Sequence, residues 1–214
     1  MPGDRGALER KERSEALLLR LDIPINPDLP IVENSNEIRL RDGKEVIRRA
    51  MCLFAVSYAA LESVAGAQSL LERWSLTEHL SPKERAFLSS ATPSHHDRVQ
   101  FSWRCEAMVP LMWATGLMEE LSFPTEDFNF EYLSDFWKTI PHGFWEGVGT
   151  RSADEILDEV DLIYRLHWAV REAQLSEMPV PGGLDEGVVM ERHHALNWLI
   201  GYGECDWDDV TTDT

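Results

Sequence analysis

The sequence predicts an all-α protein: a single globular domain of about seven to nine helices, with long irregular loops and at most a minor strand element. Apolar residues recur at spacings of three and four along several stretches, which is the period of a helix. Patterns that begin helices, a serine followed three residues later by an acid, occur at Ser81, Ser94 and Ser152. Hydrophobic residues make up 43% of the 214 residues, enough for one sizeable core.

The N-terminal part begins with a charged stretch. We expect residues 1–11 to form a charged extension and residues 12–214 to form one helical domain, with a first helix over 8–21 whose first half is solvated. Three prolines then rule out a regular helix over 23–36, so this segment is predicted to be an extended loop that wraps the body. The pattern over 37–41 is compatible with a short strand.

The central helices follow from periodicity and start signals. The stretch 44–65 is apolar on nearly every face, which indicates a central, buried helix. Further helices are predicted around 67–74 and from Ser81. The next is predicted to run from Ser94 to about residue 121 with a kink at Pro110. Another, over 152–175, is apolar on two faces and should be largely buried.

Aromatic residues concentrate between these helices. A short helix is predicted near 131–138, with loops on both sides. Most of the rings are expected to complete the core, because aromatic side chains dominate cores. The alternative is that some of them, such as Phe144 and Trp145, lie in a mobile loop and form a partner surface. The segment 123–148 holds eight of the chain's twenty aromatics, namely Phe123, Phe128, Phe130, Tyr132, Phe136, Trp137, Phe144 and Trp145.

The chain ends in a helix followed by an acidic segment. Asp185 can cap this helix, and His193 falls on its apolar stripe. Beyond Gly201 the acidic residues surround Trp207 and Val210, which are costly to leave in water. We therefore expect this tail to fold back against the helix, with Arg192 as the counter-ion of one of its aspartates.

Composition limits the classes of function. With 20 basic and 38 acidic residues the net charge is −18, which argues against nucleic acid and anionic membrane surfaces and suits a basic protein partner. Cys52, Cys105 and Cys205 are odd in number and widely spaced, which indicates reduced thiols. The N-terminus carries no signal peptide, and the longest apolar run is shorter than the roughly twenty residues of a membrane span. We expect a cytoplasmic protein.

Several segments resemble a bacterial family known as the domain of unknown function DUF4272. They are, in chain order, SEALLLRLDIPINPDLP, IRLRDGKEVIRRA, FSWRCEAMVPLMWATG, EVDLIYRLHWAVREA, ERHHALNWL and DWDDVTTDT. The resemblance spans about residues 14–214. It implies one globular domain, usually without a transmembrane segment, of which the closing residues are a part. The family name implies no activity and supplies no catalytic residues.

Charged residues inside otherwise apolar helices are candidates for a ligand site, because buried charges must be paired. If they converge they form a polar pocket; the alternative is a set of structural salt bridges that fix helix register. The tentative ligand-binding residues are Arg104, Glu106, Asp161, Arg165, His167, His193, Arg192, Asp208 and Asp213.

The histidines suggest a metal site as a further hypothesis. His193 and His194 are adjacent on a helix and point about 100° apart, so they cannot easily share one ion. His193 could instead combine with His167, Asp208 or Asp213 to bind Zn, Mn or Fe. The alternative is a core histidine hydrogen-bonded to a carbonyl or carboxylate.

The first functional hypothesis is a soluble, acidic binding protein without catalysis of its own, which in one narrower form is immunity-like towards a basic partner. The second is a metal-dependent enzyme or a small-molecule sensor that uses the interior Arg/Glu/Asp/His cluster. A third is a homo-oligomer that buries the aromatic segment. The sequence indicates no particular cofactor.

Overall fold

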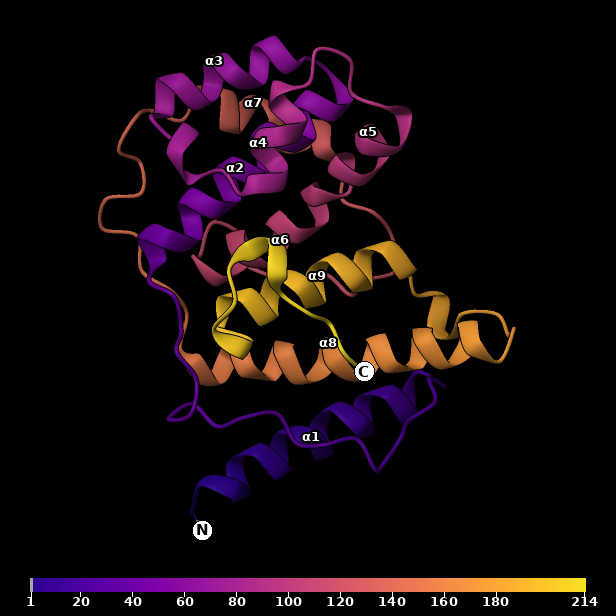
Figure 1. The fold of residues 1–214 in the computed structure, drawn as a ribbon. Helices are drawn as coiled ribbons and strands as arrows, with labels where there is room; N and C mark the ends of the chain where they lie inside the picture. The colour runs from indigo at the N-terminus through magenta and orange to yellow at the C-terminus, as the bar shows by residue number, and fades with distance from the viewer. Residues whose placement is uncertain (1) are drawn as a thin grey trace.

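The computed structural model describes residues 2–214, including the side chains of residues 6–131 and 134–214. Within this range all regular secondary structure is helical, with nine α-helices, four short 3-10 helices and no strand. This confirms the predicted all-α class. The helices stack into one body in which α1, α8, α9, α6, α2 and α3 follow one another in space, each in contact with the next (Figure 1).

Helix α1 (Pro2–Arg20) begins earlier than the predicted residue 8, and Met1 lies outside the described residues. It packs along α8 (Ala153–Leu175), as Figure 1 shows. Arg10 is buried in this contact and pairs with Asp158 of α8 at 3.2 Å. The charged part of the helix is therefore not simply solvated, because Arg10 and Arg13 both pair with Asp158 of α8.

Residues 22–42, which we call the strap, run from α1 to α2 as extended chain. The region 37–41, compatible in sequence with a strand, forms none in the described chain. Instead Arg39 N and Arg41 N donate to the carbonyls of Ile200 and Leu199 at 3.2 and 3.0 Å. These are carbonyls that the end of a helix leaves without partners, so the strap caps α9 (Glu186–Leu199).

Helix α2 (Gly43–Leu61) is the central helix that its sequence predicted, with nearly every residue buried. The Asp42 carboxylate caps it by accepting from Glu45 N at 2.8 Å. Helices α3 (Val64–Trp74), α5 (His95–Ser102) and α6 (Arg104–Ala114) pack around it. Helix α4 (Pro82–Ser89), reached through the 3-10 helix η1 (Thr77–His79), begins with the predicted capping box at Ser81.

The prediction of one helix from Ser94 to about residue 121 is wrong in two respects: the chain forms two helices, and the second one ends well before residue 121. Helices α5 and α6 are interrupted at Trp103, and Pro110 lies inside α6. Helix α6 ends at Ala114 because Gly116 adopts a left-handed conformation, with φ +75°. Leu117 N then donates to Met112 O at 2.9 Å and Gly116 N to Trp113 O at 3.0 Å, which satisfies the last carbonyls.

The aromatic segment completes the core, as expected. It contains α7 (Phe130–Thr139), in which Trp137 is fully buried. Trp145 is also buried, and Phe144 packs partly buried against the core, so neither ring forms an exposed partner surface. The side chain of Tyr132 lies outside the described residues.

The remaining elements are short 3-10 helices: η2 (Pro181–Gly183) before α9, then η3 (Tyr202–Glu204) and η4 (Trp207–Asp209) after it. None of the helices described between residues 2 and 214 combines the length and apolar character that crossing a membrane requires.

Candidate functional site

A pair of buried histidines lies where α8 and α9 pack against each other. His167 comes from α8 and His193 from α9, and their Nδ1 atoms are 2.8 Å apart. The two rings stand nearly perpendicular, with centroids 5.1 Å apart and an interplanar angle of 88°. This contact, which we call the histidine pair, brings together two residues that the sequence singled out.

Burial keeps both rings uncharged at neutral pH. Desolvation lowers the pKa of His193 to about 3, and the nearby His167 lowers it further in the same direction. Desolvation likewise lowers the pKa of His167 to about 4, with a contribution from the charge of Arg171. Because the two Nδ1 atoms are in hydrogen-bond contact, one must carry the hydrogen and the other must accept it. The two rings therefore hold opposite tautomers.

Opposite tautomers leave two different groups free. The ring that donates through Nδ1 has a bare Nε2, which accepts hydrogen bonds; the other ring has an Nε2–H, which donates them. Neither Nε2 is hydrogen-bonded to a described residue. The histidine pair therefore offers one acceptor and one donor, and moving the shared hydrogen between the Nδ1 atoms exchanges these roles.

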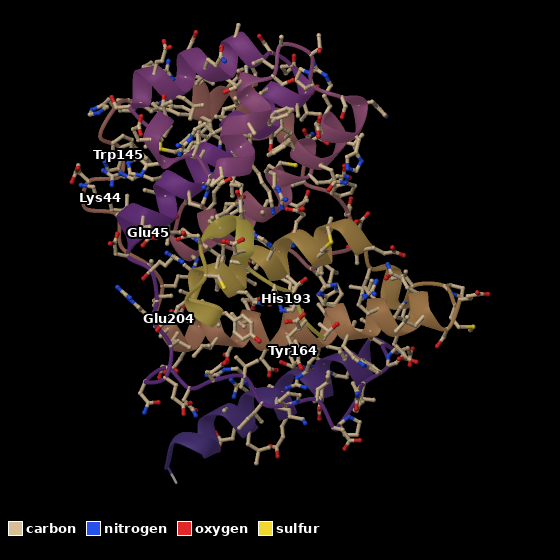
Figure 2. All side chains as sticks on the ribbon, in the orientation of Figure 1. Lys44, Glu45, Trp145, Tyr164, His193 and Glu204 are labelled. Carbon is tan, nitrogen blue, oxygen red and sulfur yellow. The ribbon has the colours of Figure 1, made fainter. Side chains whose placement is uncertain are left out.

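Each histidine lines a separate cleft. The first, which we call the strap cleft, has a volume of about 330 Å³ and is enclosed by residues 30–33 of the strap, by α8 and α9, and by the C-terminal segment. His193, Tyr164, Asn197 and Tyr202 line it, and the Tyr164 ring lies 6.0 Å from that of His193 (Figure 2). His167 lines the second cleft, of about 540 Å³, at the other side of the C-terminal segment.

The charged residues of α6 and α9 form two ion pairs near this region. Arg104 Nη1 contacts both carboxylate oxygens of Glu191 at 2.8 and 3.0 Å. Arg192 Nη2 approaches Glu106 at 3.4 Å, and its Nη1 donates to Ser122 O at 2.6 Å. Burial raises the pKa of Glu191 to about 7 in spite of its arginine. These contacts link helices in the way that structural salt bridges do.

Asp161 and Arg165 form a third, separate pair within α8, at 2.7 and 2.9 Å. Arg165 also donates to Pro30 O of the strap at 3.3 Å and lies 3.6 Å from Glu15 of α1. The structure therefore does not bring the predicted charged residues into one polar pocket. It distributes them over three ion pairs, and the two histidines form a site of their own.

The acidic tail folds back as predicted, although its contacts are different from those expected. Trp207 is only 5% exposed, and its carbonyl contacts His194 Nε2 at 3.0 Å. Asn197 Nδ2 donates to Thr211 O at 2.9 Å. The expectation that Arg192 neutralises a tail aspartate is wrong, because its guanidinium points away from the tail, toward Glu106.

The two tail aspartates considered as metal ligands lie in different places. Asp208 accepts from Lys83 N at 2.8 Å at the start of α4, whereas Asp213 lines both clefts beside the histidine pair. Among the side chains that the structure describes, those of residues 6–131 and 134–214, no group of three or more His, Cys, Asp or Glu is arranged to hold a metal ion. The two imidazoles direct their Nδ1 atoms at each other.

The model of the family described as domain of unknown function (DUF4272) matches residues 10–210, nearly the whole chain. The chain belongs to the DUF4272 family. No curated protein and no solved structure matches it. The family description assigns no activity, so the function of this DUF4272 protein has to be argued from its site.

The sequence of this DUF4272 chain indicated both histidines and an extended loop over 23–36 that wraps the body, but it did not place Tyr164, Asn197 or this loop at the site. A signal existed for Tyr164, since it precedes His167 by three residues and so shares its side of α8. The strap carries no motif. Its place over His193 depends on contacts between segments more than a hundred residues apart, which a local pattern does not record.

Proposed function

We propose that this DUF4272 protein is a small-molecule sensor that binds an uncharged, polar ligand in the strap cleft. The observation that carries the proposal is the His193 ring of the histidine pair, which is buried and neutral, lines this cleft, and has an Nε2 that is hydrogen-bonded to no described residue. The volume of about 330 Å³ lies at the lower end of the range for small-molecule sites.

The surroundings favour a planar ligand that contains an amide or lactam group. Such a group carries one donor and one acceptor, so it can pair with Nε2 of His193 in either tautomer of that ring. Tyr164 and Tyr202 supply aromatic surface beside the histidine. An anionic ligand is disfavoured because the carboxylates of Glu33 and Asp213 line the same cleft.

Ligand-observed NMR with benzamide, nicotinamide and 2-pyridone as probes tests the proposal. We expect saturation transfer to at least one of them in the intact protein and its loss in His193→Phe, which keeps an aromatic ring, slightly larger than imidazole, but removes both nitrogens. The matched control is His96→Phe on the exposed face of α5, which should bind like the natural protein. Binding to none of the probes, or equal binding in His193→Phe, would contradict the proposal.

A second candidate is recognition of a basic protein partner by the acidic surface, and the ion pairs favour it. Many of the basic side chains pair with acidic side chains of the same chain. The chain has 38 acidic and 20 basic residues, so the excess negative charge of −18 is left for the surface. One narrower form of this function is an immunity-like inhibitor. The paired basic residues are Arg10, Lys11, Arg13, Arg41, Lys44, Arg49, Arg104, Arg151, Arg165 and Arg192.

Affinity capture at low salt, followed by binding measurements with the captured protein, tests this second function. We expect a basic partner whose Kd weakens by roughly tenfold or more between about 50 and 300 mM NaCl, because exposed charges are screened over that range. A partner that binds equally well at both salt concentrations would argue against recognition by charge.

We place this activity in the cytoplasm because Cys52, Cys105 and Cys205 are all free, and cell fractionation checks it.

A further inference from the structure

We propose that a pocket at the N-terminal end of α2, which we call the α2 pocket, binds a small oxyanion such as a phosphate monoester or a carboxylate. The cavity has a volume of about 320 Å³ and lies between α2, η1, the start of α4 and the C-terminal segment. It shares no lining residue with the strap cleft, so it is independent of the function proposed above.

Four cationic side chains line this single pocket, in a chain where acids outnumber bases by 38 to 20. They are Arg41 at the end of the strap and Lys44, Arg48 and Arg49 in the first turns of α2. Lys44 and Arg48 are four residues apart and so share a side of the helix. Figure 2 shows Lys44 and Glu45 beside the segment that carries Trp145.

Three of these cations have a carboxylate partner and one does not. Arg41 pairs with Glu45, Lys44 with Glu146 at 2.7 Å, and Arg49 with Glu84 at 2.6 Å. No carboxylate among the described side chains lies within ion-pair distance of Arg48. Its guanidinium instead stacks over the Trp145 ring, at 5.1 Å from the centroid.

Two arginine N–H groups in the pocket lack an acceptor. Nε of Arg48 and Nε of Arg49 are both sealed from solvent and make no hydrogen bond, and the whole Arg49 side chain is 6% exposed. Buried donors in proteins are normally satisfied, so two orphans in one cavity require an explanation. Because neither Nε is accessible to solvent in this structure, the oxygen atoms of a bound anion would provide these acceptors only after a shift of the two side chains.

The carboxylates that line the pocket are mostly committed to backbone groups. Asp42 caps α2 by accepting from Glu45 N, and Asp208 accepts from Lys83 N at 2.8 Å. Glu45 pairs with Arg41, and Asp206 is exposed to solvent. The acids and the bases of the lining are thus equal in number, and Arg48 is the cation that has no carboxylate partner among the described side chains. Burial and then the charges of Arg48 and Arg49 lower the pKa of His79, which lines the same cavity.

The chemistry of the lining selects an oxyanion. A guanidinium presents its N–H donors in a fixed plane that matches two oxygens of a carboxylate or a phosphate. Stacking on Trp145 holds the plane of Arg48, so less side-chain freedom is lost when an anion binds. Lys44 adds a point charge from the next turn of the same helix side.

Isothermal titration calorimetry of the full chain with phenyl phosphate and with benzoate tests the proposal, because these probes differ only in the anionic group. We expect at least one to bind at a single site, and its Kd to weaken roughly tenfold or more in Arg48→Gln, as for loss of a charge-assisted contact. The probe that binds more tightly identifies the source of the oxyanion, and equal binding supports a general oxyanion site.

The matched control is Arg98→Gln on the exposed face of α5, which removes the same charge elsewhere and should leave the Kd unchanged. Arg48 makes no hydrogen bond, so we expect Arg48→Gln to fold; Lys44→Gln, at a half-buried position, provides a second variant that should also weaken binding. The proposal is wrong if neither probe binds at about 10 mM, a concentration above which affinity is negligible, or if both variants bind as the natural protein does.

Discussion

Individual buried ions in this protein depend on their partners, and Arg49 with Glu84 is the clearest case. Both side chains are almost fully buried, at 6% and 1% exposure. Removing the charge of one partner leaves the other uncompensated in a medium of low dielectric. We therefore expect Glu84→Gln to lower the free energy of unfolding by roughly 3–5 kcal/mol in a urea titration.

The solvent-exposed pair of Lys44 and Glu146 is the natural control for that measurement. Glu146→Gln should leave stability almost unchanged, because water and salt screen an exposed pair. Gln at position 84 can still accept from Ser81 N, so the helix cap is kept and the loss reports the charge. Equal urea midpoints for the two variants would show that the buried pair is not a structural requirement.

The histidine pair predicts a particular dependence of stability on pH. Folding lowers both pKa values, to about 4 and about 3, so the unfolded chain takes up protons first as the pH falls below its ordinary histidine value of about 6.5. The stability that the protein has with both rings neutral is fully present above about pH 6.5. It is lost as the pH falls toward the pKa values of the folded state, about 4 and about 3. At pH 5 the loss reaches at most about 2 kcal/mol for each ring.

Comparing the natural protein with the double variant His167→Phe/His193→Phe isolates the effect of the two histidines on the pH dependence of stability. Burial raises the pKa of Glu191 to about 7, which has the opposite effect on the pH dependence, but this residue is present in both proteins and cancels in the difference. The natural protein should therefore lose stability relative to the double variant between pH 7 and pH 5, measured by urea unfolding. Parallel pH curves for the two proteins would refute buried neutral histidines.

Among the elements, the strap and α9 hold each other in place through a close backbone contact. Gly201 has φ +72°, and a Cβ there would lie 2.7 Å from Arg39 O. Gly203 has a similar φ of +64°, but its nearest neighbour is the Cys205 Sγ at 3.2 Å. Alanine strains the backbone at both positions, so the difference between them reports contact with the strap.

We expect Gly201→Ala to be less stable than Gly203→Ala by roughly 1–3 kcal/mol, because the Arg39 carbonyl belongs to backbone that cannot rotate away. The midpoints of urea unfolding of the two variants measure this difference. If the two variants have the same urea midpoint, the strap backbone moves to accommodate the new Cβ and does not fix the end of α9.

The sequence predicts individual helices well where local chemistry decides them. Caps at Ser81 and Ser152 and the apolar faces of α2 gave the correct elements, since these signals depend on neighbours within one turn. It failed at the end of α6, where the left-handed Gly116 outweighs an apolar pattern that continues to residue 121. That glycine was a readable stop signal.

The sequence predicted which histidines belong to the candidate site, but it did not predict how they are arranged in space. His193 was recognisable on an apolar helical stripe, and His167 was named as a partner. Their Nδ1 contact, however, depends on how α8 and α9 pack. Arg48 was missed because an arginine in the first turns of a helix is ordinary. What distinguishes it is that no carboxylate among the described side chains lies within ion-pair distance of it in space.

At the scale of the whole molecule, the charge of −18 should make stability depend on salt. Repulsion among surface acids opposes the compact state, and raising NaCl from about 10 to 150 mM shortens the screening length from roughly 30 to 8 Å. The same salt weakens exposed ion pairs, but these contribute little. We therefore expect Tm to rise by a few degrees in differential scanning calorimetry, equally in NaCl and KCl because screening does not distinguish the cations. A Tm that falls would mean that the ion pairs between α1 and α8, such as Arg10 with Asp158, outweigh the repulsion and hold the first helix to the body.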